Sequence, residues 1–444
     1  MTNELLEIEK GFEVKVPTCH GLFAWKFLRQ KFYFETMRKK YEFNPSPRNR
    51  SKLQLAKNFF WGFGNLFNLS KFEYLFFNNA DKRTLQVGNK HYDVFFDAWA
   101  DKYGQEKSIF IEWAINRHFP SKSTYSKHAV SDLPFKLLSR VYSFFVSSNC
   151  KELQVFEDIK AEYGLHFNVE GELRAKMGEM YMYRRLLRWT KPKAVFLISS
   201  FTKMPLVVAA HLEGIPVIEA QHGFIGKNHQ FYLSEHVFDD LYYPDKLIAF
   251  GSYEKSIKIP KLIFGPDKIL PVGSLYLENV LDTIYNENLA NLGKQYEKLF
   301  LVTLQCLKEK ELLGWIERQA LGNSDWGFIL KPRDYSHMDY SKFTGIKNIM
   351  LFPTYSVYEI LKHVDYNITI FSTVAIEAEA FGVKTIFFNL DGLSLKYFEP
   401  SSMNASVVNL KTPSLDKEHL DKTQNKASYF KMGYRQNVKN TELF

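Results

Sequence analysis

The chain repeats one pattern over most of its length: a short run of β-branched and aromatic residues, a polar turn, and a segment with helical spacing. Residues 366–389 show it most clearly, because two apolar runs, 368–371 and 385–388, flank the Ala- and Glu-rich stretch 374–381. Such runs are typical of buried parallel strands, and the stretch between them is typical of a helix that ends at Gly382. This segment therefore predicts a strand–helix–strand unit.

Two series of such units divide the chain. The first runs from a strand at 193–199 and a helix at 203–213 to three further strands. The second begins with a strand at 299–304 and ends with the unit described above. Strands that alternate with helices indicate α/β domains with parallel sheets. We also expect strands at 91–97, 108–113, 215–220, 245–251, 268–274, 327–330 and 348–352, and helices at 171–189, 308–320 and 355–365.

The two series predict two Rossmann-like domains with a cleft between them, because polar residues follow the strands of both. The first domain covers residues 1–281 and includes an N-terminal extension that matches no recognised pattern. Residues 282–296 are polar and Asn-rich, which is typical of an interdomain linker. The second domain covers 297–411, and residues 412–444 are expected to form a crossing helix and a loose tail.

Composition and charge narrow the class of partner. Hydrophobic residues make up 45% of the chain, and the net charge is +9. The basic residues are spread out, and no helix-turn-helix, RRM or zinc-finger signature is present, so we expect no nucleic-acid partner. Anionic sugar nucleotides and an anionic membrane are the other partners for such a charge. The basic and aromatic segment 26–43 either lies on a membrane or forms a surface helix that packs its rings inward.

The cysteines point to a reducing compartment. Cys19, Cys150 and Cys306 are widely separated and form no Cys-x-x-Cys or Cys/His cluster, so neither a disulfide framework nor a structural zinc site is expected. The N-terminal residues lack the charged-then-apolar pattern of a signal peptide, and no apolar run approaches the length that spans a bilayer. We therefore expect a cytoplasmic protein that is soluble or peripheral to the inner membrane.

Ser372 and Thr373 stand where the strand 368–371 ends and the next helix begins. Backbone N–H groups and the helix dipole favour an anion at such a junction, and ligands of α/β proteins sit at the carboxyl ends of parallel strands. Glu377 lies one helical turn further on, on the side of Thr373. These residues suggest phosphate at the hydroxyls and sugar hydroxyls at the carboxylate. An ordinary strand–helix unit with a Ser-Thr cap is the alternative.

Three motifs follow predicted strands in a fixed order between residues 190 and 390. The first is AQHG at 220–223; the second is IAFG at 248–251, followed by VGS at 272–274. The third is FSTVAIEAEAFGVKTIFF at 371–388. In their order and spacing these motifs resemble those of GT-B glycosyltransferases of bacterial surface polysaccharide biosynthesis, such as capsule and O-antigen. They are also similar to those of CDP-glycerol-type phosphotransferases.

The resemblance implies an α/β fold of the GT-B type, in which two Rossmann-like domains with extra N-terminal elements face an interdomain cleft that binds a nucleotide-activated sugar. It implies no cofactor and no metal, since no Asp-x-Asp motif is evident. Many relatives carry His-Pro where this chain has basic residues on either side of Pro332, and such residues suit phosphate. The expected donor-binding residues are Lys331, Arg333, Ser372, Thr373, Glu377, Gly251 and Ser274.

An inverting transfer needs a general base near the acceptor hydroxyl, whereas a retaining one does not. His222 is the first candidate, because it follows a predicted buried strand and Gly223 leaves room for a ligand. Glu219 and Glu112 compete for the role. Weaker candidates are Asp97, Asp101, His118 and His229, and the residues expected to line the acceptor side are Gln221, Gly223, Phe224 and Lys227.

The leading hypothesis is an inverting, metal-independent glycosyltransferase, with CMP-linked sugars among its candidate donors. Its expected partners are the nucleotide-sugar donor, an oligosaccharide or lipid-linked glycan acceptor, and the inner-membrane surface. Transfer of a polyol phosphate from a CDP-linked donor is an alternative within the same fold. A non-catalytic scaffold in a polysaccharide assembly complex is an alternative of another class.

Overall fold

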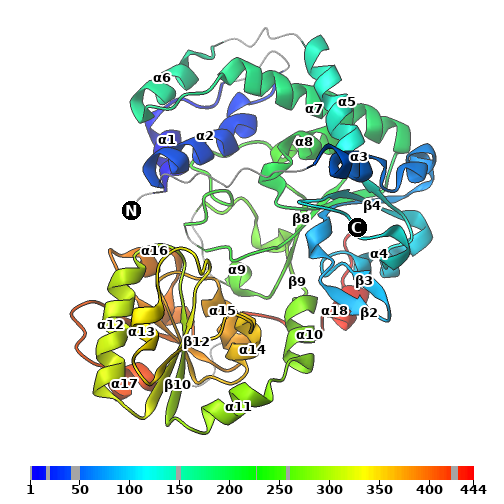
Figure 1. The fold of residues 1–444 in the computed structure, drawn as a ribbon. Helices are drawn as coiled ribbons and strands as arrows, with labels where there is room; N and C mark the ends of the chain where they lie inside the picture. Colours follow the sequence, from blue (N-terminus) through cyan, green and yellow to red (C-terminus); the bar gives the residue numbers. More distant parts are fainter. Residues whose placement is uncertain are drawn as a thin grey trace.

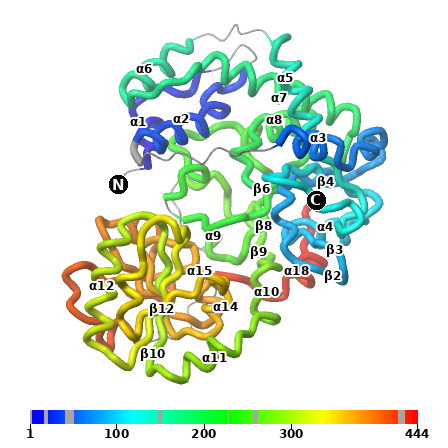
Figure 2. The backbone as a smooth tube through the Cα atoms, in the orientation of Figure 1, coloured from blue at the N-terminus to red at the C-terminus, as the bar shows by residue number. Residues whose placement is uncertain are grey.

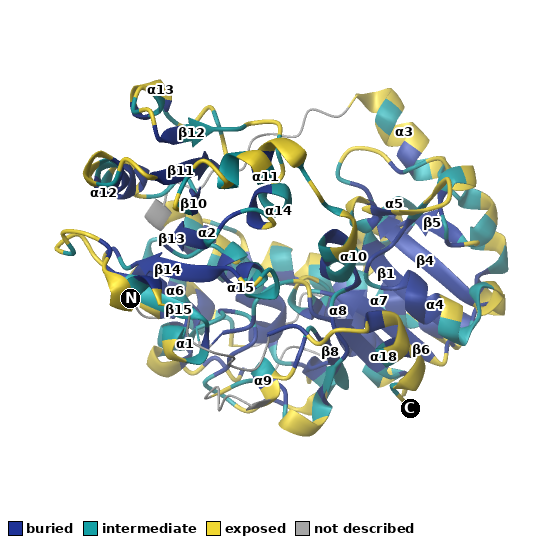
Figure 3. Cartoon of the chain, turned by 90° about the horizontal axis from the view of Figure 1, so that it is seen from below, coloured by how far each residue is buried: buried dark blue, intermediate teal, exposed yellow. Residues whose placement is uncertain are grey.

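Two parallel β-sheets, one in each half of the chain, organise the structure, which is a computed structural model (Figure 1). It describes residues 3–16, 21–41, 51–146, 152–226, 228–256, 261–421 and 429–444. The strands of both sheets are largely buried, and helices cover them (Figure 3). Near-continuous apolar strands of this kind are what a sheet covered on both faces requires.

The first sheet has seven parallel strands in the order β5-β4-β1-β6-β7-β8-β9. Its first strand, YLFFNN, pairs with both β4 and β6, and the sequence pattern did not predict it. Successive strands are added on one side of β1 up to β5 and on its other side from β6 onward. A ligand is expected at this switch point between β1 and β6. The strands are β1 Tyr74–Asn79, β4 Ser108–Trp113, β5 Ala129–Ser131, β6 Ala194–Ile198, β7 Val217–Ala220, β8 Lys246–Ala249 and β9 Ile269–Pro271.

The strand predicted at 91–97 is wrong beyond Tyr92. Residues Leu85–Val87 (β2) and Lys90–Tyr92 (β3) form a small antiparallel hairpin. The carboxylate of Asp93 then accepts hydrogen bonds from the N–H groups of Phe95 and Phe96, at 2.9 and 2.8 Å, and so closes a turn. A helix follows at once, because local side-chain hydrogen bonds of this kind compete with an extended backbone.

Helices surround the first sheet. One of them, α2, contains most of segment 26–43, which was expected either to lie on a membrane or to pack its rings inward. Trp25, Phe27 and Phe32 are buried on α2, and the ammonium group of Lys26 lies 4.2 Å from the ring centre of Tyr243. The described part of this segment therefore packs inward. The helices are α1 Glu4–Gly11, α2 Ala24–Tyr41, α3 Lys52–Phe60, α4 Asp97–Tyr103, α5 Leu133–Phe145, α6 Gln154–Tyr163, α7 Val169–Thr190, α8 Met204–Leu212 and α9 Tyr253–Ser256.

The second sheet has six parallel strands in the order β12-β11-β10-β13-β14-β15, which corresponds to the Rossmann order 3-2-1-4-5-6. Every strand predicted for this half is present, and β15 was not predicted. The strands are β10 Lys298–Thr303, β11 Trp326–Lys331, β12 Ile349–Leu351, β13 Tyr366–Thr369, β14 Lys384–Phe388 and β15 Ala405–Val408. The helices are α12 Glu309–Gly322, α13 Ser341–Thr344, α14 Val357–Leu361, α15 Val374–Ala380, α16 Leu393–Tyr397 and α17 Lys417–Leu420.

The segment predicted as a linker, 282–296, holds ordered structure. After α10 (Leu275–Thr283), a second helix, α11 (Glu287–Gly293), buries Leu289 against Leu299 of the second domain. The backbone N–H of Asn286 also donates to the imidazole of His363, at 3.1 Å. Apolar burial therefore makes most of this segment part of the second domain, despite its polar composition.

The C-terminal segment returns to the first domain, as Figure 2 shows in red. Helix α18, Tyr434–Asn440, lies against α4 and α10. The phenol of Tyr434 donates to the carbonyl of Phe95, at 2.8 Å, and Leu443 is buried. Residues 429–443 therefore pack against the first domain, with a helix at their centre. Two Rossmann-like domains joined in this way and facing a shared cavity form the GT-B fold that the sequence predicted.

Candidate functional site

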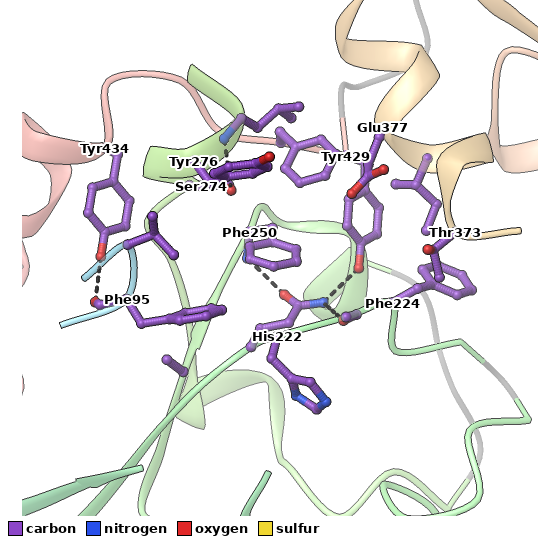
Figure 4. Close-up of a pocket in the computed structure, with 18 of the residues that line it drawn as sticks. Phe95, His222, Phe224, Phe250, Ser274, Tyr276, Thr373, Glu377, Tyr429 and Tyr434 are labelled. Carbon is purple, nitrogen blue, oxygen red and sulfur yellow. Dashed lines mark hydrogen bonds between the residues drawn. The ribbon is translucent and has the colours of Figure 1, made fainter. Parts of the chain in front are cut away.

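A cavity of about 310 Å³ lies between the two domains (Figure 4). The first domain contributes the turn after β1 and the segments that follow β7, β8 and β9, while the second contributes α14 and the first turn of α15. The returning C-terminal segment closes part of the wall. Ligands of α/β sheets bind at this carboxyl edge, so the cavity is the candidate site. Residues that line it include Lys82, His222, Tyr276, Thr373, Glu377 and Tyr429.

Gln221 holds the first-domain wall together. Its side-chain carbonyl accepts the backbone N–H of Phe250 at 2.8 Å. Its amide nitrogen lies 2.9 Å from the carbonyl of Gly223 and 2.7 Å from both Glu254 Oε1 and the hydroxyl of Tyr429. Gln221 is buried and therefore ties three chain segments to the end of β7. It lines the cavity as predicted, but its polar atoms are engaged by the protein.

His222 is exposed to the cavity, and its ring nitrogens lie 3.2 and 3.3 Å from the hydroxyl of Ser199. Ser199 follows β6 with a φ of 56°, a left-handed conformation that is uncommon for a residue other than glycine and is often found at functional sites. The protein around the imidazole removes much of its water, and this, together with the charge of Lys82, lowers the pKa of His222 to about 4. The imidazole is therefore neutral at neutral pH.

Glu377 and Thr373 of the second domain line the cavity. The carboxylate of Glu377 accepts a hydrogen bond from the phenol of Tyr358 at 3.0 Å, and burial raises its pKa to about 7. The side chain of Thr373 is exposed to the cavity. Ser372 is not among the lining residues: its hydroxyl accepts the N–H of Val374, the first residue of α15, at 3.3 Å. Of the predicted Ser-Thr pair, the cavity wall includes Thr373 alone.

The basic residues predicted at the donor site do not reach the cavity. The ammonium group of Lys331 donates to the carbonyl of Tyr355 at 2.6 Å and lies 2.9 Å from the hydroxyl of Tyr335, while Arg333 is exposed at the surface. Neither residue is among those that line the cavity, and their role at a donor site stays a prediction. Of the described residues that line the cavity, Lys82 is the one lysine or arginine. It escaped prediction because it follows β1, the strand that the sequence pattern missed.

Glu219 and Glu112, the two other predicted candidate bases, are both buried and are not among the residues that line the cavity. Glu219 accepts the N–H of Ser200 at 3.0 Å and the phenol of Tyr232 at 2.6 Å, and burial raises its pKa. It thereby anchors the turn that carries Ser199. A buried carboxylate with this role supports the site without touching a ligand.

Glu112 belongs to a buried charge cluster in the first domain. Burial alone would raise its pKa, but the guanidinium group of Arg83 and the imidazole of His118 together outweigh this effect and hold the pKa of Glu112 below its usual value. Arg83 also contacts Asp97 at 3.2 Å, and the Glu112 carboxylate lies 3.7 Å from His118. These weaker candidates are thus parts of the domain core. Asp101 accepts the phenol of Tyr125 at 3.2 Å and also lies outside the cavity wall.

Some of the remaining predicted residues line the cavity, and others lie outside its wall. Gly223, Phe224 and Ser274 line the cavity. Gly251 does not: a Cβ there would lie 2.0 Å from the carbonyl oxygen of Tyr429, so glycine is needed for the close approach of the C-terminal segment. His229 packs against the ring of Tyr232, with 4.6 Å between ring centres, and is also absent from the wall. Lys227 lies outside the described residues.

The remaining expectations concern metal ions and the membrane. Across those residues, no group of three or more His, Cys, Asp or Glu side chains is placed to hold a metal ion. Within the same ranges, no helix combines the length and apolarity needed to cross a bilayer. Metal independence and the absence of a cofactor stay predictions.

No family model matches the chain, and no curated protein matches it in sequence. Among solved structures it is similar to a UDP-N-acetylglucosamine 2-epimerase, with 12% identity over 83% of this chain and 94% of that chain and a TM-score of 0.46. The epimerase from Methanocaldococcus jannaschii has 13% identity over 82% and 97% of the two chains, with a TM-score of 0.45. The calicheamicin glycosyltransferase CalG4 has 12% identity over 83% and 92%, with a TM-score of 0.43. At these values the likenesses carry no argument about the chemistry of this chain.

Proposed function

We propose that the protein is a GT-B glycosyltransferase, which moves a sugar from a nucleotide-activated donor to a saccharide or lipid-linked acceptor. The observation that carries the proposal is the composition of the interdomain cavity, where Thr373 and Glu377 of one domain line the same space as His222 of the other. Groups suited to a phosphorylated sugar and a group suited to accepting a proton thus meet within one cavity.

The second-domain wall suits the nucleotide of the donor. An ionised Glu377 accepts hydrogen bonds from ribose hydroxyls, and Thr373 offers its hydroxyl to a phosphate oxygen. Negative charge builds up on that phosphate as the bond to the sugar breaks, and Lys82 supplies a positive charge at the opposite wall. The proposal therefore places the donor phosphate between Lys82 and the start of α15.

The first-domain wall suits the acceptor. With a pKa of about 4, the imidazole of His222 is neutral and holds a free lone pair at neutral pH. It takes the proton of an acceptor hydroxyl as that oxygen bonds to the anomeric carbon and the bond to the leaving phosphate breaks. Ser199, whose hydroxyl is within 3.3 Å of the ring, orients it for this step. This assignment holds for an inverting transfer.

The test is to incubate the purified protein with CMP-, CDP-, UDP- and GDP-linked donors and to measure binding by calorimetry and turnover by chromatography. We expect one nucleotide class to bind and to be consumed. Glu377→Gln should weaken binding, whereas Glu379→Gln, a second carboxylate on α15 that does not line the cavity, should not. Failure of all four donor classes to bind would overturn the proposal.

The same experiment separates glycosyl transfer from the two alternatives, transfer of a polyol phosphate and a scaffold role. Phosphorus NMR of the product distinguishes the two transfer reactions, because only transfer of a polyol phosphate moves phosphorus from the donor to the acceptor. A scaffold, in contrast, would keep its cellular function when Thr373, Glu377 and His222 are substituted together.

A further inference from the structure

Three elements around the edge strand β5 expose apolar side chains on one side of the first domain: α3, the 3₁₀ segment η1 (Phe63–Lys71) and α5. Figure 3 shows α3 largely exposed, and Figure 1 shows it beside α5. We call this surface the α3–η1–α5 face. Large apolar side chains seldom gather at such exposure on a monomeric soluble protein. The most exposed members of this face are Leu53, Phe60, Phe67, Leu137, Phe144 and Phe145.

The inner side of α5 is already fully packed. Phe135 is buried in the domain core, and a Cβ on Gly178 of α7 would lie 2.6 Å from the backbone nitrogen of Ser143, so the two helix backbones are in close contact. The exposed positions 137, 138, 141, 144 and 145 have the spacing of a single stripe on the outer side. The rings of Phe144 and Phe145 are 83% and 82% exposed. This stripe is therefore a second apolar face of α5.

The neighbouring elements extend the stripe with aromatic rings. Phe60 contacts Phe63 with 5.6 Å between ring centres, and Phe63 contacts Phe67 at 5.8 Å. Phe67, at the end of this row, is 75% exposed. A row of exposed rings of this kind suits insertion into a soft interface such as a lipid bilayer.

The charged residues of these three elements are almost all basic. Residues 51–71 and 131–146 contain five lysines and arginines and one acidic residue, Asp132. Asp132 is buried and bonded to Lys136 at 2.6 Å, so it offers little negative charge to solvent. Basic residues beside exposed aromatic and aliphatic side chains complement an anionic lipid surface, where the charges meet headgroups and the rings enter the acyl boundary. The basic residues are Lys52, Lys57, Lys71, Lys136 and Arg140.

We infer that the α3–η1–α5 face docks the protein on the surface of an anionic lipid bilayer. The face belongs to the first domain, lies apart from the cavity-lining residues and depends on none of them. The inference therefore stands whether or not the proposed transfer reaction is correct. If the reaction is correct, the docked protein holds its cavity near acceptors anchored in the same bilayer.

The test is sedimentation of the full-length protein with vesicles of phosphatidylcholine alone or mixed with phosphatidylglycerol. We expect the protein to bind the mixed vesicles, and Phe144→Ser with Phe145→Ser to lower its partition coefficient by about tenfold or more. Lys57→Glu with Arg140→Glu should lower binding to the mixed vesicles only. Val237→Ser is the matched control, since Val237 is 88% exposed on the same domain outside this face.

Three results would overturn the inference: no binding of the unaltered protein, equal binding of the double serine variant, or loss of binding in the control. Self-association that the double serine variant abolishes, without vesicle binding by the unaltered protein, would assign the face to a second copy of the chain. Thermal unfolding of each variant should match that of the unaltered protein, because the substituted side chains are exposed.

Discussion

The phenol of Tyr358 donates a hydrogen bond of 3.0 Å to the carboxylate of Glu377 at the wall of the interdomain cavity. The two residues lie on separate helices, α14 and α15, and both line the cavity, so the bond holds the carboxylate in the cavity wall. Burial raises the pKa of Glu377 to about 7, despite this bond. The group therefore changes charge in the physiological range, which makes its role measurable.

Donor binding should strengthen as the pH rises through the pKa of Glu377. If only the carboxylate form accepts the ribose hydroxyls, affinity should increase about tenfold between about pH 6 and about pH 8. Glu377→Gln should flatten this dependence in calorimetric titrations, and Glu379→Gln should preserve it. The pH dependence of stability has the opposite sign. Because burial makes the pKa of Glu377 higher in the folded protein than in the unfolded chain, the protonated group stabilises the fold at low pH, and this contribution is lost as the pH rises through about 7. An unchanged pH dependence in Glu377→Gln would exclude the carboxylate from the donor site.

His222→Ala should lower turnover by about a hundredfold or more while donor affinity changes little, because a general base acts in the transition state. The rate of the unaltered protein should be flat above about pH 5 and fall as the imidazole is protonated near its pKa of about 4. Single-turnover kinetics measure both effects. His337→Ala, at an exposed position outside the cavity, is the control. Equal turnover in the two variants would remove His222 from the chemistry.

Gly251→Ala should destabilise the protein by about 2–4 kcal/mol, because its Cβ would lie 2.0 Å from the carbonyl oxygen of Tyr429. The C-terminal segment must then shift, and Tyr429 leaves its place in the cavity wall, so donor affinity should fall as well. Urea unfolding and calorimetry measure the two effects. Gly314→Ala on α12, with no atom within 4 Å of its Cβ position, should instead stabilise the protein by up to about 1 kcal/mol. A neutral effect of Gly251→Ala would contradict the close approach.

Arg83→Met should cost about 3–5 kcal/mol of unfolding free energy, because it leaves Asp97 and Glu112 buried without their counter-charge. The loss should shrink at low pH, where protonation neutralises both carboxyl groups. Urea unfolding at two pH values measures this difference. Arg318→Met, at an exposed helix position, should change stability by less than about 0.5 kcal/mol. Equal losses in the two variants would contradict a structural role for the cluster.

Much of the fold was predictable from local pattern. Apolar runs such as 299–304 and 385–388 became central strands, because a strand buried on both faces must be apolar throughout. The strand β1 escaped prediction, since it ends in Asn78 and Asn79 and is followed by a single 3₁₀ turn, Ala80–Lys82, in place of an α-helix. The polar composition of 282–296 likewise concealed α11, whose burial depends on one leucine and a neighbouring domain.

The sequence by itself determined which segments become strands and helices and which polar residues follow them, because these features depend on neighbours along the chain. It thereby brought His222, Thr373 and Glu377 into consideration. Only the tertiary structure decided which of the candidates share a cavity. Strand order and the return of the C-terminal segment bring Lys82, Glu377 and Tyr429 to one cavity, although they lie far apart along the chain. The same packing buries Glu219 and Glu112, since the environment of a carboxylate is set by residues that pack against it from other parts of the chain.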